Sequence, residues 1–401
     1  MKNNYKFFLL IPALLCLIIL MQKQNIKVAI IRERSLNPWE MQNYYGLSGV
    51  ETIFIAPEDN TIPFSELPFT PIVMKKAHER KLSVMHWEKT LKNIIIHRAQ
   101  KLWFYPYTLE QILKDVDIVH TVDLKSRATY TAAMLKKKYN FKLVVTVWEN
   151  IPFLYRQKAR WSYMRDHVLE YVDLIHAVTR DAQDALLVEG MKNIPIKIIP
   201  YGVDLVRFQP AKPVKRSYFT ILFIGRHVYE KGIFELLNAI KFLTVTGVED
   251  IRLVMVGNNT EGLKSTVKEM GIEKFIGFTG FVSYAGLNKI YNQADVFVLP
   301  SIPVEGWKEQ YGMVLIEAMS SGLPIIASKS GSIPEVVGDT AVFVSPGEYK
   351  DIANAIRTLK NDQALRNRLA FNSRERAKEL FDSVVSASRL SEMYRMLQSG
   401  S

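Results

Sequence analysis

Short runs of apolar, often β-branched residues recur along the chain and alternate with segments of helical periodicity. Runs bounded by charged or turn residues predict buried parallel strands, and the segments between them predict helices. The predicted strands are residues 26–31, 117–121, 142–147, 174–178 and 196–199 in the first half, and 219–224, 251–257, 275–281, 295–299 and 325–328 in the second. This alternation predicts an α/β protein with two doubly wound, Rossmann-like sheets.

The chain is too long for one ordinary hydrophobic core, since it has 401 residues. Residues 200–204 read Pro-Tyr-Gly-Val-Asp, which is the turn chemistry of a joint between domains. We therefore predict one domain at residues 25–204 and a second at residues 205–381. Residues 350–397 repeat apolar positions near period 3.6 and are predicted to be helical throughout.

The richest chemistry lies in residues 301–324, between the predicted strand 295–299 and a helix that begins near Gly312. In parallel α/β sheets, ligands bind outside the carboxyl ends of strands, and free N–H groups at a helix start favour phosphate groups. Glu309 is predicted to lie at the mouth of such a crevice. Glu317 lies inside the helix among apolar neighbours, so we expect a partly buried carboxylate whose partners are sugar or ribose hydroxyls.

A second candidate site follows the predicted strand 219–224. Gly225 and Arg226 come directly after this strand, and Lys231 and Gly232 precede the next helix. Glycine permits close approach of the backbone, and two cations can balance a diphosphate. The alternative is an ordinary loop with surface cations, but the spacing favours an anion site.

Glu309 and Glu317, eight residues apart and followed by Gly322-Leu323-Pro324, resemble the Glu-x7-Glu signature of retaining glycosyltransferases of family 4. These enzymes have the GT-B fold, in which two Rossmann-like domains face each other across a cleft. The resemblance runs from about residue 25 to about residue 381. Three further stretches match the family in its own order, namely residues 198–204, 225–232 and 332–338.

The resemblance implies a role for each matching residue. The implied catalytic residues are Glu309, His120, Arg226 and Lys231. The implied donor-binding residues are Gly225, Arg226, Lys231, Val282, Gly312, Met313, Val314 and Glu317. Glu309 would orient sugar hydroxyls, Glu317 would bind the ribose, and backbone groups at Val282 would hold the base. His120 would lie beside the donor sugar, whereas its position in a strand, taken alone, indicates a core histidine.

The resemblance also implies that residues 382–401 form a final helix that crosses back onto the first domain. The donor would be a UDP-sugar or a GDP-sugar, without a further cofactor. No metal site is visible, which agrees with the metal independence of the family. Trp148 and Glu149 follow the strand 142–147, and either they face the acceptor or Trp148 fills the domain interior.

Positive charge is concentrated in the first half of the chain. The formal net charge is +12, of which residues 1–200 carry +9, and residues 72–103 alone carry +6 together with Trp87 and Trp103. A basic amphipathic helix with such an apolar face is typical of membrane-surface binding, and the alternative is a solvated helix face. No nucleic-acid-binding motif occurs among these basic residues.

The segment 1–24 contains an apolar run, residues 7–21, flanked by lysines. We interpret it as an uncleaved membrane anchor, with a peripheral or hairpin insertion as the alternative. Together with the basic segment, it suggests a first domain resting on an anionic membrane, catalytic domains facing the cytoplasm, and a lipid-linked or glycan acceptor. The single cysteine excludes an internal disulfide.

The function that these observations favour is transfer of a hexose-like sugar from a nucleoside-diphosphate donor to a hydroxyl acceptor, with retention. A non-catalytic GT-B adaptor at a membrane surface remains an alternative, as does an epimerase or phosphorylase of the same fold. A dinucleotide oxidoreductase is disfavoured because no G-x-G-x-x-G follows the first strand.

Overall fold

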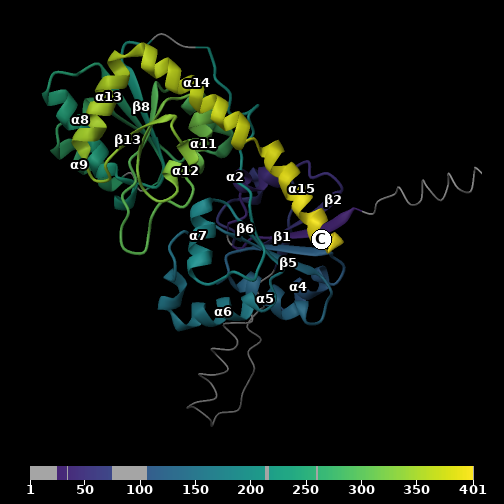
Figure 1. Cartoon of the computed structure of the whole chain (residues 1–401). Coiled ribbons are helices and arrows are strands. Elements are labelled where there is room, and N and C mark those ends of the chain that lie inside the picture. Colours follow the sequence, from purple (N-terminus) through teal and green to yellow (C-terminus); the bar gives the residue numbers. More distant parts are fainter. Residues whose placement is uncertain (1–24, 34, 75–105, 213–215, 259–260, 401) are drawn as a thin grey trace, which may run out of the picture.

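The computed structural model describes residues 25–33, 35–74, 106–212, 216–258 and 261–400. The predicted anchor at residues 1–24 and nearly all of the predicted basic helix lie outside these residues. The described chain forms two α/β domains, the first in purple to blue and the second in green to yellow (Figure 1). No helix among the described residues combines the length and apolarity that crossing a membrane requires.

The first domain is built on a seven-stranded parallel sheet with the order β3-β2-β1-β4-β5-β6-β7. Its strands are β1 (Ile26–Ile31), β2 (Val50–Pro57), β3 (Ile72–Met74), β4 (Ile118–Val122), β5 (Lys142–Val147), β6 (Leu174–Ala177) and β7 (Ile196–Ile198). Its helices are α2 (Pro38–Met41), α4 (Pro106–Leu113), α5 (Arg127–Lys136), α6 (Ala159–Leu169) and α7 (Arg180–Val188).

The second domain is built on a six-stranded parallel sheet with the order β10-β9-β8-β11-β12-β13. Its strands are β8 (Phe219–Ile224), β9 (Ile251–Val256), β10 (Ile276–Gly280), β11 (Val296–Leu299), β12 (Ile325–Ser328) and β13 (Ala341–Val344). Its helices are α8 (Ile233–Val245), α9 (Glu261–Glu269), α10 (Leu287–Tyr291), α11 (Met313–Ser320), α12 (Ile333–Val337), α13 (Tyr349–Asn361) and α14 (Gln363–Leu380).

The strand order reverses once in each sheet, between β1 and β4 and between β8 and β11. At such a switch point the loops after the two strands run in opposite directions, which opens a crevice for ligands at the carboxyl edge. The two predicted doubly wound sheets are therefore confirmed. One prediction was wrong, because residues 72–74 form strand β3 beside β2 rather than the start of a basic helix.

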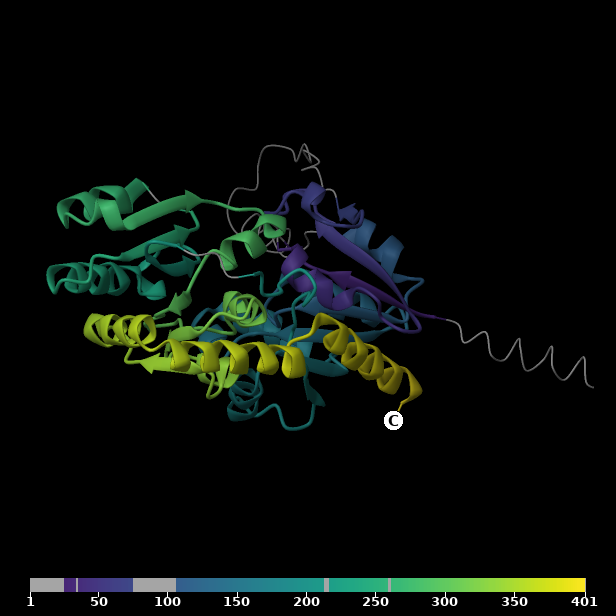
Figure 2. The same cartoon turned by 90° about the horizontal axis from the view of Figure 1, so that it is seen from above.

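The periodicity predicted that the C-terminal tail is helical throughout. In the structure the tail is divided into three helices, α13, α14 and α15 (Ser383–Ser399). The two breaks follow from capping, because Asp362 accepts a hydrogen bond from the backbone N–H of Leu365 and Asp382 accepts one from that of Val384. Helix α14 lies along the second domain and α15 along the first (Figure 2). Ser386 of α15 donates to the backbone oxygen of Pro200 at 2.8 Å.

The chain crosses between the domains twice, and the two crossings lie side by side. The backbone N–H of Val203 donates to the oxygen of Phe381 at 2.8 Å, and that of Ser383 donates to the oxygen of Val203 at 3.0 Å. A Cβ atom on Gly202 would lie 2.4 Å from the oxygen of Phe381. Glycine is therefore required here because two backbone segments approach closely, rather than because of an unusual φ.

Candidate functional site

The loops that follow β8 and β11 meet at the switch point of the second sheet. Gly232 caps α8 with a φ of +69°, and a Cβ atom there would lie 2.0 Å from the backbone oxygen of Pro300. Pro300 directly follows β11, so the loop after β8 rests on the backbone of the loop after β11. This close approach brings Lys231 next to Ser301 and Glu309, which the sequence separates widely.

Lys231, Ser301 and Glu309 form a compact polar cluster. The Nζ atom of Lys231 lies 2.6 Å from Oε2 of Glu309, and the hydroxyl of Ser301 donates to the same oxygen at 2.9 Å. Both side chains of the ion pair are largely buried, and Trp307 covers Lys231 with its ring centre 5.0 Å from Nζ. The carboxylate of Glu309 is thereby fixed at the carboxyl edge of the sheet, with a cation beside it.

The backbone of Glu309 is held from both domains. Its oxygen accepts hydrogen bonds from Nδ2 of Asn150, at 2.9 Å, and from the N–H of Ser332, also at 2.9 Å. Gly331 is required at this point, because a Cβ atom there would lie 2.0 Å from the same oxygen. The carboxyl edges of the two sheets therefore face each other across this contact.

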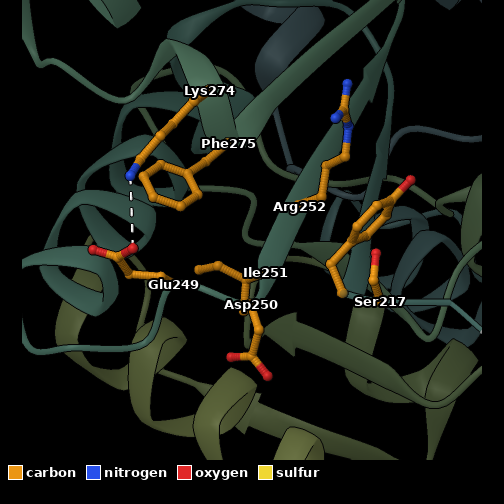
Figure 3. A pocket seen from close by; sticks show the side chains of 8 residues that line it. Ser217, Glu249, Asp250, Ile251, Arg252, Lys274 and Phe275 are labelled. Carbon is orange, nitrogen blue, oxygen red and sulfur yellow. Dashed lines mark ion pairs between the residues drawn. The ribbon is translucent and has the colours of Figure 1, made fainter.

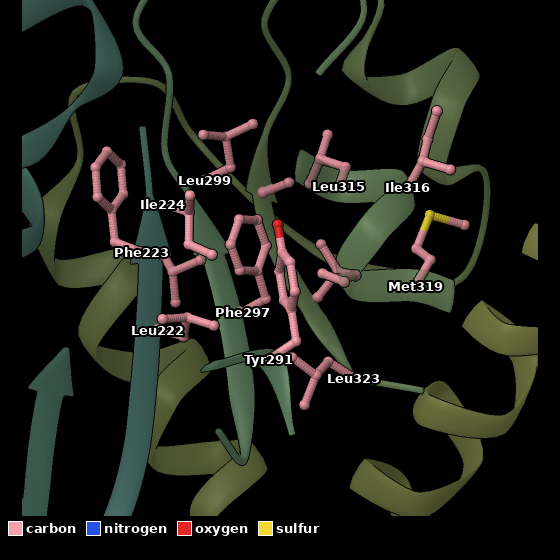
Figure 4. Packing of buried hydrophobic residues seen from close by; sticks show 14 of the residues in the cluster. Leu222, Phe223, Ile224, Tyr291, Phe297, Leu299, Leu315, Ile316, Met319 and Leu323 are labelled. Carbon is pink, nitrogen blue, oxygen red and sulfur yellow. The ribbon is translucent and has the colours of Figure 1, made fainter. Parts of the chain in front are cut away.

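Glu317 is more completely buried than the sequence suggested, with 3% of its surface exposed. Tyr291 stands in the apolar core between β11 and α11 (Figure 4), and its hydroxyl donates to Oε2 of Glu317 at 2.7 Å. Burial raises the pKa of Glu317 to about 8, and the hydrogen bond from Tyr291 only partly opposes this shift. Glu317 is thus mainly protonated at neutral pH and can donate a hydrogen bond as well as accept one.

The start of α11 completes the arrangement around Glu309. Gly312 adopts a φ of +79° before the first helical residue, and no side chain caps the helix. The N–H groups of Met313 and Val314 therefore begin the helix without a side-chain partner, as an anion site requires. Val282, predicted beside the base, follows β10 and is partly buried.

The loop after β8 places its two predicted cations differently. Gly225 approaches the backbone of Gly257, where a Cβ atom would lie 1.9 Å from the oxygen of Gly225. Arg226 extends into solvent and its guanidinium contacts Glu230 at 3.2 Å. Lys231, in contrast, points inward to Glu309, so the structure brings only one of the two cations to the carboxylate.

His120 lies away from this cluster, in the interior of the first domain. Its Nδ1 lies 2.5 Å from the hydroxyl of Tyr394 in α15, and its Nε2 lies 2.7 Å from that of Thr146. Burial lowers the pKa of His120 well below its usual value, and the neighbouring His176 adds to the effect. The resemblance placed His120 beside the donor sugar, and the structure corrects this prediction, because His120 is a neutral histidine in the core. Strand β4 continues to Val122, and both ring nitrogens have hydrogen-bond partners.

Trp148 fills the space between the domains. Its ring lies 5.1 Å from that of Tyr201 and 5.5 Å from that of Tyr311, measured between ring centres. Glu149 accepts hydrogen bonds from the hydroxyl of Tyr155 and from Nε2 of Gln310, each at 3.2 Å. Of the two alternatives for Trp148, the structure favours the packing role.

Sequence reasoning missed three residues of this site, namely Asn150, Tyr291 and Ser301. Asn150 and Ser301 each follow a predicted strand, which was the available signal. Tyr291 had no such signal, because its partner lies 26 positions further along the chain.

A separate pocket of about 280 Å³ lies at the opposite, amino-terminal edge of the second sheet (Figure 3). Its lining residues precede β8, β9 and β10 or begin β9, among them Ser217, Asp250 and Phe275. Lys274 and Glu249 form an exposed ion pair of 3.6 Å across its rim. The pocket shares no residue with the cluster at Glu309, because the two lie at opposite ends of the strands.

Two family models match the chain in succession. Residues 43–207 match "Glycosyltransferase Family 4" and residues 206–376 match "Glycosyl transferases group 1". The boundary between the two matches falls at the first crossing between the domains.

Individual relatives match parts of the chain. An MMP alpha-(1->4)-mannosyltransferase of Mycolicibacterium hassiacum is 26% identical over 67% of this chain and 67% of its own length. A mannosylfructose-phosphate synthase of Agrobacterium fabrum is 29% identical over 52% of this chain and 50% of its own length. The chain thus spans between half and two thirds of the length of these relatives.

Solved structures share the fold over nearly the whole chain. A sucrose-phosphate synthase of Thermosynechococcus elongatus superposes with a TM-score of 0.73 at 19% identity, covering 94% of this chain and all of that one. HepE of Anabaena in complex with UDP superposes with a TM-score of 0.72 at 16% identity, covering 92% of this chain and 99% of that one. The arrangement of the two domains is therefore that of GT-B glycosyltransferases.

Proposed function

The chain belongs to the family 4 glycosyltransferases of GT-B fold, and on this premise we propose that it transfers a hexose-like sugar from a nucleoside-diphosphate sugar to a hydroxyl acceptor with retention. The observation that carries the proposal is the buried cluster of Lys231, Ser301 and Glu309. It lies at the switch point of the second sheet and beside the uncapped start of α11.

The cluster has the groups that donor chemistry requires. The N–H groups of Met313 and Val314 and the ammonium of Lys231 would bind the diphosphate, whose negative charge grows as its bond to the sugar breaks. Lys231 has three donors, so it can contact a phosphate oxygen while it keeps its bond to Glu309. The carboxylate of Glu309 would accept hydrogen bonds from sugar hydroxyls and thereby fix the anomeric carbon.

The remaining predicted contacts concern the nucleoside. Glu317, neutral at pH 7 through its burial, would exchange hydrogen bonds with the ribose hydroxyls. The backbone after β10, at Val282, would contact the base. HepE of Anabaena, which shares the fold, was solved in complex with UDP, and this supports a nucleotide donor for the present chain.

The decisive experiment incubates the full chain with a panel of UDP-sugars and GDP-sugars, with and without a membrane lipid extract, and measures released nucleoside diphosphate. Glu309→Gln should lower the rate by about two to three orders of magnitude, the usual effect of losing one preorganised polar contact. The matched control is Glu305→Gln, which makes the same change at an exposed position four residues earlier. The product's anomeric configuration, read by NMR, tests retention.

Other outcomes of this experiment identify the alternatives. Recovery of an epimerised nucleotide sugar without transfer indicates an epimerase, and dependence of sugar transfer on inorganic phosphate indicates a phosphorylase. An adaptor would bind membranes and release no nucleoside diphosphate from any donor.

We infer a lipid-linked or glycan acceptor, with the first domain on the cytoplasmic face of an anionic membrane. The support is the sequence of residues 1–24 and the +6 charge of residues 72–103. A chain starting near Lys23 should still bind anionic vesicles, and this binding should weaken as the salt concentration rises. Binding that is equal for neutral vesicles, or absent altogether, would contradict the membrane part of the proposal and leave the donor site untouched.

A further inference from the structure

One side chain of the first domain reaches the backbone of the donor cluster. Asn150 follows β5, and only 2% of its surface is exposed. Its Nδ2 donates to the backbone oxygen of Glu309 at 2.9 Å and to the hydroxyl of Ser332 at 3.1 Å. Glu309 and Ser332 both belong to the second domain, so the amide of Asn150 spans the boundary between the domains.

The orientation of this amide follows from its two partners. A backbone oxygen can only accept a hydrogen bond, so the nitrogen of Asn150, rather than its oxygen, must face Glu309. The hydroxyl of Ser332 accepts from the same nitrogen and donates to Oδ2 of Asp181 at 3.2 Å. The amide oxygen of Asn150 is buried and accepts no hydrogen bond from the residues that the structure describes. Asn150 therefore serves as a donor to the second domain.

A carboxylate of the second domain holds the two domains together beside Asn150. Glu335, in α12, accepts from the backbone N–H of Arg180, at 2.7 Å and 2.9 Å from its two oxygens, and from that of Asp181 at 3.2 Å. These N–H groups begin α7 and have no partner within the helix, and the helix dipole favours a negative charge there. Helix α12 therefore lies against the start of α7 (Figure 1), which keeps Ser332 within reach of Asn150.

Different domains hold the side chain and the backbone of Glu309. Lys231 and Ser301, which bind Oε2 of the carboxylate, belong to the second domain. The backbone oxygen accepts from the N–H of Ser332 in the second domain and from Asn150 in the first. The loop that leads to Glu309 is exposed at residues 303–306, so it contributes little to fixing the backbone. Asn150 thus restrains Glu309 where its own domain restrains it least.

We propose that Asn150 is a positioning residue for Glu309, through which the first domain sets this carboxylate against the donor sugar. The inference rests on the proposed glycosyl transfer, in which Glu309 orients the hydroxyls of the sugar. A reacting group that is misplaced by about 1 Å can slow a reaction by about 100-fold, even when the change that misplaces it lies away from the chemistry. Asn150 therefore acts on kcat, through Glu309. The groups proposed to bind the diphosphate lie in the second domain and do not depend on it.

The test compares Asn150→Ala with Asn193→Ala in the full chain, using the donor that it turns over. Asn193 is an exposed residue of the same domain, so it receives the same change away from the domain boundary. Asn150→Ala should lower kcat by about 100-fold, whereas the Kd of the nucleoside diphosphate, measured by calorimetry, should stay at its wild-type value. Asn193→Ala should change neither quantity. A loss of nucleoside diphosphate affinity as large as the loss of kcat would overturn the proposal.

Asn150→Asp guards against a defect of folding, because it keeps the volume of the side chain. It replaces the donating nitrogen by an oxygen, and an ionised carboxylate cannot donate to the backbone of Glu309. We therefore expect kcat to fall at least as far as in Asn150→Ala, with Asn193→Asp as the control. A wild-type kcat in an Asn150→Asp protein that melts at the wild-type temperature would contradict the positioning role.

A double-mutant cycle with Glu309→Gln separates positioning from direct contact with the sugar. Because Asn150 acts through the carboxylate of Glu309, adding Asn150→Ala to Glu309→Gln should lower kcat by no more than about twofold. A further loss of about 100-fold in the double variant would overturn the proposal. That result would indicate that the buried amide oxygen of Asn150 binds a sugar hydroxyl itself.

Failure of the proposed function has a different signature, because wild type then turns over no donor. Hydrogen–deuterium exchange followed by mass spectrometry still tests the positioning role. The backbone N–H of Ser332 donates to the same oxygen of Glu309 as Asn150 does. Asn150→Ala should accelerate exchange in peptides that contain Ser332 by about tenfold, and Asn193→Ala should not. Equal exchange in wild type and both variants would refute the restraint on Glu309.

Discussion

Replacing Glu317 by glutamine should make the protein less sensitive to alkaline pH. The folded environment raises the pKa of Glu317 from 4.5 to about 8, with burial as the main cause. A carboxyl group with a raised pKa stabilises the fold fully below pH 4.5, and this contribution is lost as pH rises towards 8, because the unfolded chain releases its proton first. Glutamine keeps the shape and an oxygen that accepts from Tyr291, but it cannot ionise.

The magnitude follows from the size of the shift. Each pKa unit corresponds to about 1.4 kcal/mol, so the difference in unfolding free energy between Glu317→Gln and wild type should increase by about 2 kcal/mol from pH 6 to pH 8. Taking the difference between the two proteins cancels the titration of all other groups that both contain.

Urea unfolding followed by circular dichroism at pH 6, 7 and 8 measures this difference. Glu305→Gln is the matched control, since it makes the same change at an exposed position. A difference that is independent of pH, or a Glu317→Gln protein that becomes relatively less stable at pH 8, would refute the assignment of Glu317 as a buried, largely neutral group.

Three further predictions concern the donor cluster. Lys231→Ala should lower nucleoside diphosphate release by about two orders of magnitude, as Glu309→Gln should, with an unchanged circular dichroism spectrum, and normal turnover would remove Lys231 from the site. Gly232→Ala should lower the melting temperature far more than Gly247→Ala. A Cβ atom at residue 232 would lie 2.0 Å from the oxygen of Pro300, whereas at Gly247, which is also at positive φ, a Cβ atom would have no neighbour within 4 Å. Equal shifts in melting temperature would contradict the close approach of Gly232 to Pro300. EDTA should leave turnover unchanged, because the resemblance implies a metal-independent enzyme, and loss of activity restored by manganese would place a metal at the diphosphate.

Much of the fold could be predicted from local pattern. A buried parallel strand needs a short apolar run, whichever strands pair with it in the sheet. The apolar pattern therefore predicted the observed first and last residues of β1, β5, β8 and β12. Strand β3 could not be found in this way, because it has only three residues and two of them are exposed. Its identity depends on the edge of β2, to which it pairs.

The candidate site could be predicted in kind but not in detail. Motif spacing singled out Lys231 and Glu309, which follow strands, and Glu317, which lies inside a helix. It could not show that Lys231 pairs with Glu309 while Arg226 extends into solvent, because that choice depends on the contact of Gly232 with Pro300. For the same reason the sequence could not tell whether His120 faces a ligand or the core.

By itself, then, the sequence predicted most of the strands, a place where the chain divides and candidate residues for donor chemistry, because these predictions depend on local apolarity, turn residues and spacing. Only the tertiary structure decided the environment of each group. The neutral state of Glu317 depends on the burial of its side chain on the inner face of α11, which outweighs the opposing hydrogen bond from Tyr291, and His120 has as a hydrogen-bond partner Tyr394, 274 residues away. Desolvation and hydrogen bonding act between residues that are distant in the chain, so no local pattern encodes them.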